Sequence, residues 1–344
     1  MPEYHYSALR EYAHCPYRAK LRYNLRIQPA VTPIPLIMGS QIHEVIATMM
    51  RVAGGQAPGD SISISIDHTL DQYPDAENEE PIKIGWTEYN RAEIREMLVN
   101  VFNRFRATRY AALLDKYEIV DVEKDFVFEF SGAKFAGTID LVLRNRETGK
   151  IEILDWKSIS RTLPENYLEL DTQKYMYAVG CMSLYGEYPA AFHVCGILKR
   201  KVKYPSVLKS GKVSTVKDDA LTINSFMAIL NLNNQNPDEY AEIIEWIKEK
   251  EATDIDIMFP MQTLALSEDA IRAGWRRVTE LKLMFEFSRN NDIWPKCDGA
   301  ACAMCKNSYL KLCVAEEKGE DTTTLLMDEY IVRDPEDRAA GWDL

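Results

Sequence analysis

Runs of apolar residues in the middle of the chain predict a set of neighbouring β-strands. Three of these runs cover Val120–Phe130, Lys134–Arg144 and Lys150–Lys157. A turn that contains Gly149 separates the second run from the third. A fourth strand is predicted at Ala191–Leu198, where most residues are apolar.

Helical spacing of apolar residues appears on both sides of these strands. In the segment Gly85–Asp115, the residues Ile94, Leu98, Val101 and Phe105 recur every three or four positions and share one helix face. Strands interleaved with helices predict an α/β fold with a mixed central sheet flanked by helices. The other predicted helices are Ser7–Tyr23, Gly39–Ala53, Tyr167–Tyr185, Leu221–Leu230, Pro237–Glu251 and Ser267–Arg289.

The order of these elements divides the chain into four parts. Residues 1–35 form an N-terminal helical segment that contains one cysteine of interest. Residues 36–235 form the core, with a polar insertion near 56–84 that we expect to be irregular. Residues 236–313 form a C-terminal helical segment that ends in a cluster of cysteines, and residues 314–344 form an acidic tail.

Composition excludes some classes of protein. The chain of 344 residues is 46% hydrophobic, which is enough for a large core, and it contains no apolar run near the ~20 residues of a membrane helix. Its N-terminus lacks the basic and then apolar order of a secretory signal, so we expect a cytoplasmic protein without a membrane partner. The formal charge of −12 argues against indiscriminate wrapping of nucleic acid but permits a local basic channel.

Two aspartates and a lysine form the main candidate site. Asp140 follows Gly137-Thr138-Ile139 within one predicted strand, and Asp155-Trp156-Lys157 ends the next. Side chains alternate along a strand, so Asp155 and Lys157 share one face and Trp156 points to the other. Two carboxylates and an ammonium group suit a divalent cation, an attacking water and a phosphate. The alternative is a solvated Asp–Lys pair that contributes little.

Further residues on both sides match a known pattern. Gly39 and His43 lie upstream, and Gln173 and Tyr177 lie one helical turn apart downstream. The ordered set G-x-x-x-H, G-x-x-D, D-x-K and Q-x-x-x-Y resembles the PD-(D/E)XK nucleases, in particular their RecB-like and Cas4-like iron–sulfur exonuclease branch. This resemblance implies a restriction-endonuclease-like fold, with the nuclease core at residues 36–235.

The resemblance also implies a role for each residue. His43, Asp140, Asp155 and the carbonyl of Trp156 would bind Mg²⁺ or Mn²⁺. Lys157 would position the attacking water and stabilise the developing charge. Catalysis would depend on Asp140, Asp155 and Lys157, with Gln173 and Tyr177 supporting the site and contacting DNA. Glu123 is either a further carboxylate near the metal or a solvated strand end.

Five of the seven cysteines do not fit a core position, and four of them crowd into a short segment near residue 300. Four thiolates suit either zinc or an iron–sulfur cluster, whereas disulfides are rare in a reducing compartment. The resemblance implies a [4Fe-4S] cluster held by one cysteine before the core and three after it, and structural Zn²⁺ is the alternative. The implied ligands are Cys15, Cys302, Cys305 and Cys313, with Cys297 surplus or a replacement for one of them.

A basic run follows the fourth predicted strand. Lys199, Arg200, Lys201 and Lys203 lie within five residues and either hold a DNA backbone or form a solvated hairpin edge. These two interpretations are equally supported by the sequence.

The sequence therefore predicts a Mg²⁺- or Mn²⁺-dependent deoxyribonuclease, in particular an exonuclease on single strands or duplex ends in recombination, repair or related DNA processing. The chain lacks the G-x-x-x-x-G-K-[ST] phosphate loop, so ATP-driven unwinding would come from a helicase or recombination partner. The alternative is a catalytically inactive nuclease-like protein that binds DNA or acts as an adaptor, with zinc or an iron–sulfur site. A cleavage assay separates the two.

Overall fold

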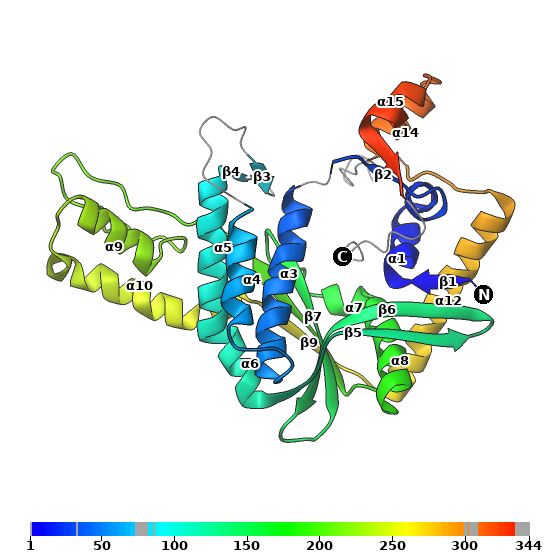
Figure 1. Cartoon of the computed structure of the whole chain (residues 1–344), viewed down its shortest axis with the longest axis horizontal. Helices are drawn as coiled ribbons and strands as arrows, with labels where there is room; N and C mark the ends of the chain where they lie inside the picture. The colour runs from blue at the N-terminus through cyan, green and yellow to red at the C-terminus, as the bar shows by residue number, and fades with distance from the viewer. Residues whose placement is uncertain are drawn as a thin grey trace.

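A six-stranded mixed β-sheet lies at the centre of the computed structural model (Figure 1). The structure describes residues 2–31, 34–72, 82–84, 87–298, 302 and 309–333. The strands of the sheet are β1 (Glu3–His5), β5 (Tyr117–Phe130), β6 (Ala133–Asn145), β7 (Ile151–Ile159), β8 (Ala191–Leu198) and β9 (Met261–Ala265).

Strand β6 connects the two halves of the sheet. The antiparallel strand β5 pairs with β6 along its whole length. On the other side, β1 pairs in parallel with the first half of β6, and β7 pairs antiparallel with residues Leu141–Arg144. Strand β8 pairs in parallel with β7, and β9 pairs antiparallel with β8. The four predicted strands are therefore confirmed, with ends shifted by a few residues.

One face of the sheet is covered by helices from the first third of the chain (Figure 1). These are α3 (Ile34–Ala53), α4 (Ser61–Leu70), α5 (Arg91–Phe105) and α6 (Ala111–Lys116), with a π-helical turn, η2 (Arg106–Tyr110), between the last two. Helix α5 begins at a capping box in which Asn90 and Glu93 bond each other's backbone N–H groups. The short hairpin of β3 (Ile82–Ile84) and β4 (Thr87–Tyr89) precedes it.

Two predictions for this region are wrong in part. Helix α3 begins at Ile34, before the glycine at which we placed its start. The insertion near 56–84 is not irregular throughout, because it contains α4. Ile62 and Leu70 of that helix are buried against the core, at a spacing that puts both on one helix face.

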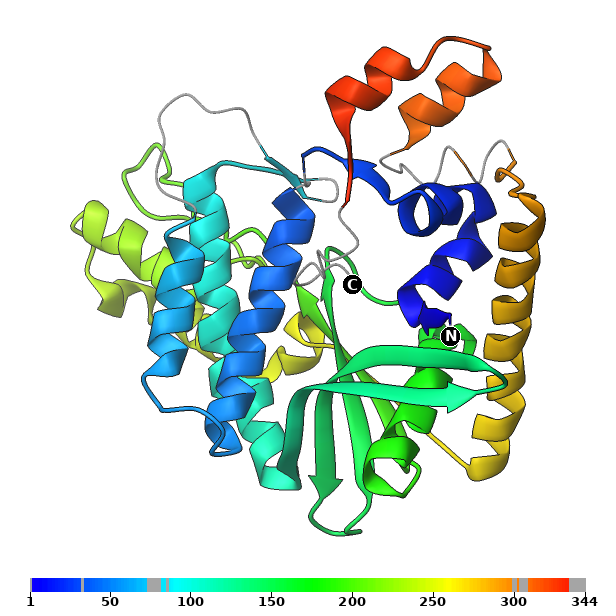
Figure 2. The same cartoon turned by 45° about the vertical axis from the view of Figure 1, so that its right-hand side comes forward.

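The other face is covered by helices from three separate parts of the chain (Figure 2). These are α1 (Tyr6–His14), α7 (Tyr167–Leu170), α8 (Gln173–Tyr185) and α12 (Glu268–Asn291). Their aromatic core includes Tyr4, Phe135 and Phe285, with Trp275 packed against Phe135 at a ring distance of 5.0 Å.

The predicted helix Ser7–Tyr23 is interrupted at Cys15. This residue is extended, with φ −159°, because the ring of Pro16 disfavours a helical conformation at the preceding position. The sulfur of Cys15 instead accepts a hydrogen bond from the N–H of Arg18 and caps the next helix. The chain after Cys15 forms α2 (Pro16–Ala19) and then the π-helical turn η1 (Lys20–Asn24).

A small helical unit follows β8 and stands at one edge of the molecule (Figure 1). It has its own apolar cluster, in which Phe226, Tyr240 and Ile247 are buried. Its helices are α9 (Ile223–Leu232), η3 (Pro237–Tyr240) and α10 (Ala241–Thr253), and the next helix, α11 (Ile255–Met258), packs on β8 with Met258 in the main core.

The two ends of the chain pack against each other. Strand β10 (Tyr330–Val332) pairs antiparallel with β2 (Ile27–Pro29). Helices α14 (Leu310–Glu317) and α15 (Thr323–Glu329) complete this region, so the described part of the acidic tail is structured. Among the described residues, none of the helices combines the length and the apolar character needed to cross a bilayer.

Candidate active site

Asp140 and Asp155 lie where strands β6 and β7 separate. The last registered pair before this point is Leu141 with Leu154. Beyond it, the backbone N–H of Trp156 donates to the Asp140 carboxylate at 2.8 Å instead of to the neighbouring strand. The two carboxylates therefore line the opening between the strands, and the side chain of Asp140 orients the backbone of the residue that follows Asp155.

Asp155 is the centre of a hydrogen-bonded network. Its side chain is 1% exposed and its Oδ2 lies 2.8 Å from the ammonium nitrogen of Lys157. Gln173 donates from Nε2 to Asp155 Oδ1 at 3.0 Å and to the hydroxyl of Tyr177 at 2.7 Å, and its Oε1 accepts from Lys157 at 3.3 Å. All four groups thus lie in one connected site. Trp156 points to the other face of the sheet, where its ring packs on Phe105.

His43 on helix α3 faces the same carboxylates. Its Nδ1 lies 3.9 Å from Asp140 Oδ2, and the residue is 7% exposed. Burial and the positive charge of Lys157 lower the pKa of His43 to about 4. The imidazole is therefore neutral near pH 7, which is the form that ligates a metal.

Glu123 on β5 contributes a third carboxylate. It lies opposite Asp140, between the registered pairs Val122–Leu141 and Lys124–Ile139, and its φ of 49° places its backbone in the left-handed region. Burial and the neighbouring Asp140 raise the pKa of Glu123 to about 8. A strained conformation that holds a half-buried acid against another acid is typical of a functional site.

The two motif glycines allow close approach of these elements. A Cβ atom on Gly39 would lie 2.9 Å from the Oγ of Ser158 on β7, so the glycine lets α3 approach the strand that carries Asp155. A Cβ atom on Gly137 would lie 2.8 Å from the ring of Phe126 on β5. At both positions an added Cβ atom would force a neighbouring side chain to move, which gives the glycines of the pattern a packing reason.

The concentration of acids at this site is electrostatically unfavourable in the apo protein. Burial raises the pKa of Asp140, and burial and Asp140 raise the pKa of Asp155 to about 7 even though Lys157 opposes the shift. A divalent cation would favour the ionised form of all three carboxylates. Oxygen donors together with one neutral imidazole fit Mg²⁺ or Mn²⁺ in chemical type.

This donor set is not preassembled around one point. Across the part of the chain that the structure describes, no three His, Cys, Asp or Glu side chains are arranged as a metal cage. At this site Lys157 occupies part of the space beside the carboxylates, because its ammonium group contacts both oxygens of Asp155. Lys157 thereby balances part of the negative charge.

The basic run after β8 is mostly paired with acids. Arg200 lies 4.0 Å from Asp219 and Lys203 lies 2.5 Å from Asp218. Lys201 lies 2.6 Å from Glu93. Lys199 is different, because it is 9% exposed and approaches the hydroxyl of Ser158 at 3.4 Å.

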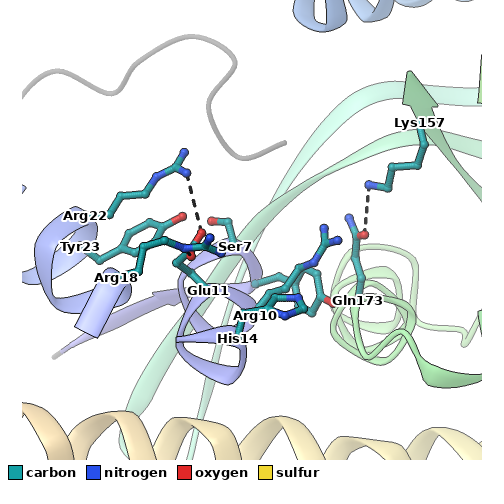
Figure 3. A pocket seen from close by; sticks show the side chains of 10 residues that line it. Ser7, Arg10, Glu11, His14, Arg18, Arg22, Tyr23, Lys157 and Gln173 are labelled. Carbon is teal, nitrogen blue, oxygen red and sulfur yellow. Dashed lines mark hydrogen bonds and ion pairs between the residues drawn. The ribbon is translucent and has the colours of Figure 1, made fainter. Parts of the chain in front are cut away.

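Sequence reasoning missed helix α1 as a wall of the site. A cavity of about 340 Å³ lies between this helix and the pair Lys157 and Gln173 (Figure 3). Arg10 and His14 of α1 line it, together with residues of α2 and η1. The sequence contained no signal of what Arg10 faces, because α1 is positioned by the short strand β1 on β6.

The predicted cysteine ligands are only partly described by the structure. Cys15 and Cys313 are both buried, and burial, together with Cys302 and Cys15, raises the pKa of Cys313 to about 11. Cys297 donates from its sulfur to the carbonyl of His14, next to Cys15. Cys305 lies outside the described residues, and the cysteines within them form no metal group. The predicted joining of the chain ends by a cysteine metal cluster is therefore not shown.

Comparison with known proteins gives the family. No protein of curated function matches the chain. Among solved structures, a crystal structure of a "Putative exonuclease" from Eubacterium rectale has a TM-score of 0.35 and 12% sequence identity, over 77% of this chain and 86% of that one. The family model of the PD-(D/E)XK nuclease superfamily matches residues 5–305, which is most of the chain and includes every residue of the carboxylate site. The chain belongs to the PD-(D/E)XK nuclease superfamily.

Proposed function

We propose that the protein is a Mg²⁺- or Mn²⁺-dependent deoxyribonuclease of the RecB-like and Cas4-like branch. One observation carries this proposal: Asp140, Asp155 and Lys157 meet at a single opening in the sheet, with Gln173 connecting Asp155 to Lys157. If Asp155 and Lys157 formed only a structural ion pair, the further carboxylates of Asp140 and Glu123 would not be needed beside it.

Each group has a separate task in this proposal. Asp140, Asp155, His43 and the carbonyl of Trp156 would hold the divalent ion, which supplies charge neutralisation and an activated water. Lys157 stabilises negative charge on the phosphoryl oxygens and orients the nucleophile. Gln173 is a positioning residue, since its amide fixes both Asp155 and Lys157, and Tyr177 fixes Gln173 in turn.

We propose single-stranded DNA or DNA ends as the substrate, in recombination, repair or a related process. Lys157 lines the cavity along α1, whose volume of about 340 Å³ suits an unpaired strand better than a duplex. Unwinding of a duplex would come from a separate helicase, since the sequence has no ATP-binding phosphate loop. Of the basic run, we retain only Lys199 as a phosphate contact. Its ammonium group lies 3.4 Å from the hydroxyl of Ser158 on β7, the strand that carries Asp155.

We also propose a [4Fe-4S] cluster held by Cys15, Cys302, Cys305 and Cys313. Support comes from the effect of Cys302 and Cys15 on the pKa of Cys313 and from the packing of Tyr309 and Leu312 against Leu21. A cluster at this place would tie the two chain ends together. An anaerobic preparation should be brown, with absorbance near ~400 nm; a colourless protein with one zinc per chain would favour the zinc alternative.

The test of the proposed activity is digestion of end-labelled single-stranded and duplex DNA with Mg²⁺, Mn²⁺ or EDTA. Cleavage in the presence of either cation and none with EDTA is the expected result. Wild-type protein that binds DNA yet leaves it intact under all conditions would contradict the nuclease and support an inactive DNA-binding protein.

A further inference from the structure

Helix α1 separates two cavities that differ in chemical character. The first, of about 340 Å³, is the basic cavity that reaches Lys157 and Gln173. The second, of about 720 Å³, lies between α1, the segment around α7 and helix α12. Tyr6, Arg10 and His14 line both cavities and form their shared wall.

Arg10 is the charged group at this junction. Figure 3 shows its side chain directed from α1 towards Gln173 and Lys157. No hydrogen bond or ion pair joins it to a residue within the described ranges, although the nearby Tyr167, Tyr6, Asp171 and Asp155 raise its pKa against the opposing effect of burial. The other two arginines of the basic cavity are engaged, because Arg18 bonds Glu11 and Arg22 lies 3.9 Å from the same carboxylate. Arg10 therefore has its donors available for a ligand anion.

The second cavity has mostly apolar walls with aromatic rings. Tyr6 and Tyr167 line it together with Leu170 and Met284, which are 71% and 56% exposed. The ring of Tyr6 is held in place because its hydroxyl donates to Asp171 Oδ1 at 2.5 Å. An exposed apolar cavity beside a cationic wall suits a ligand with one flat apolar part and one anionic part.

Asp171 adds a second indication of a ligand. Its Oδ1 accepts from Tyr6 and from the N–H of Gln173. Its Oδ2 is buried and has no hydrogen-bond partner within the described ranges, and Asp171 lines the apolar cavity. A buried acceptor without a donor is costly, and the amino group of a base is a donor of the required kind.

We propose that α1 carries a binding site for one unpaired nucleotide next to the scissile phosphate, with Arg10 on its phosphate and its base in the apolar cavity between Tyr6 and Tyr167. This inference rests on the proposed nuclease function and specifies the substrate, because a base that is paired and stacked in a duplex cannot enter the cavity. The site would make single-stranded ends the preferred substrate.

The test compares Arg10→Ala and Arg10→Lys with Arg272→Ala. Arg272 is a matched control, since it is an exposed arginine that pairs with Glu268 within α12. Binding of a fluorescent single-stranded oligonucleotide is measured by anisotropy in Ca²⁺, at several salt concentrations. We expect Arg10→Ala to weaken binding about tenfold or more and to reduce the salt slope by about 0.7, as for loss of one phosphate contact. Arg10→Lys should restore part of the affinity, and Arg272→Ala should match the wild type.

The base is tested separately with Tyr167→Ala. The wild type should bind an oligonucleotide that lacks the base next to the scissile phosphate about five- to a hundredfold less tightly than the intact strand. Tyr167→Ala should lose most of this discrimination. A single neutral methylphosphonate placed beside the scissile phosphate tests the phosphate contact on wild-type protein, so the result does not depend on the folding of a variant.

Three results would overturn the inference: unchanged affinity and salt slope in Arg10→Ala, equal affinity of the wild type for duplex and single strand, or no effect of the methylphosphonate. These results are independent of cleavage. If Arg10→Ala loses DNA binding but the wild type does not cleave DNA, the nucleotide site is retained and the nuclease function is rejected. If the wild type cleaves DNA but Arg10→Ala binds DNA as tightly as the wild type, the nuclease function is retained and the nucleotide site is rejected.

Discussion

Strand β7 carries two buried carboxylates whose surroundings differ sharply. Glu152 accepts three hydrogen bonds, from Tyr117 at 3.0 Å, Asn145 at 2.9 Å and His193 at 2.7 Å. The bond from His193 does most to lower the pKa of Glu152 to about 2, against the opposing effect of burial. Asp155, three residues along the strand, has a pKa raised to about 7 by burial, with Asp140 adding to the shift.

The difference shows that burial does not decide the role of an acid. Glu152 is surrounded by donors that satisfy its charge, so it contributes to the stability of the fold. Asp155 shares its space with other carboxylates and has one lysine to balance them, and we propose that its charge serves to bind a cation. On this proposal, the same strand carries a structural acid and a catalytic acid on opposite faces of the sheet.

The largest expected effect tests the functional acid. Asp155→Asn and Lys157→Ala should each reduce DNA cleavage by about 10³-fold or more, because each removes a group that acts on the transition state. Rates are measured with end-labelled single strands in Mg²⁺. Folding is checked by thermal unfolding, and Glu152→Gln is the control that changes a buried carboxylate of the same strand and should keep most of the activity.

Undiminished cleavage by both site variants would remove the proposed division of roles. So would a loss of activity in Glu152→Gln as large as that in Asp155→Asn. In either case the carboxylate site would not be where the chemistry takes place.

The next effect concerns the structural acid. Glu152→Ala leaves Tyr117, Asn145 and His193 without their acceptor inside the protein, and it should lower the free energy of unfolding by about 3 kcal/mol. Urea unfolding at neutral pH measures this. Asp155→Asn, by contrast, should leave stability unchanged or raise it, because it removes one of several repelling carboxylates. Equal destabilisation by the two variants would contradict the comparison.

A smaller effect depends on pH. A carboxyl whose pKa is lower in the folded than in the unfolded protein contributes stability that is present above the unfolded value and is lost as the pH falls towards the folded value. For Glu152 this window runs from its ordinary pKa of 4.5 down to about 2. The stability difference between wild type and Glu152→Ala should therefore shrink by about 1.5 kcal/mol between pH 4.5 and pH 3. A difference that stays constant or grows in this range would show that Glu152 is not stabilised as an anion.

The arrangement of side chains along β7 could be predicted from the sequence because its information is local. Alternation along β7 places Asp155 and Lys157 together and Trp156 opposite, as the structure shows. The pairing of Asp140 with the backbone of Trp156 follows from neighbouring strands joined by a short turn.

Contacts between distant segments could not be predicted in the same way. Tyr117, Asn145 and His193 converge on Glu152 from three strands, and no spacing in the sequence relates them. Arg10 and Lys157 line one cavity because β1 pairs in parallel with β6 and positions α1, and the break at Cys15 turns Arg18 of α2 into the same cavity. Such relations depend on sheet order and helix breaks, which hydrophobic periodicity does not determine.

The smallest prediction concerns how closely α3 approaches β7. Gly39→Ala gains about 0.5–1 kcal/mol of helix propensity, but its Cβ atom meets Ser158 Oγ at 2.9 Å, so α3 must shift and carry His43 away from Asp140. We expect stability close to that of the wild type and cleavage lower by about fivefold, since a small misplacement of a ligand is costly. Ser158→Ala in the same chain removes the clash, so the double variant should regain activity and be more stable than the wild type. If the two substitutions are simply additive in both measurements, the glycine of the G-x-x-x-H pattern is not there to admit Ser158.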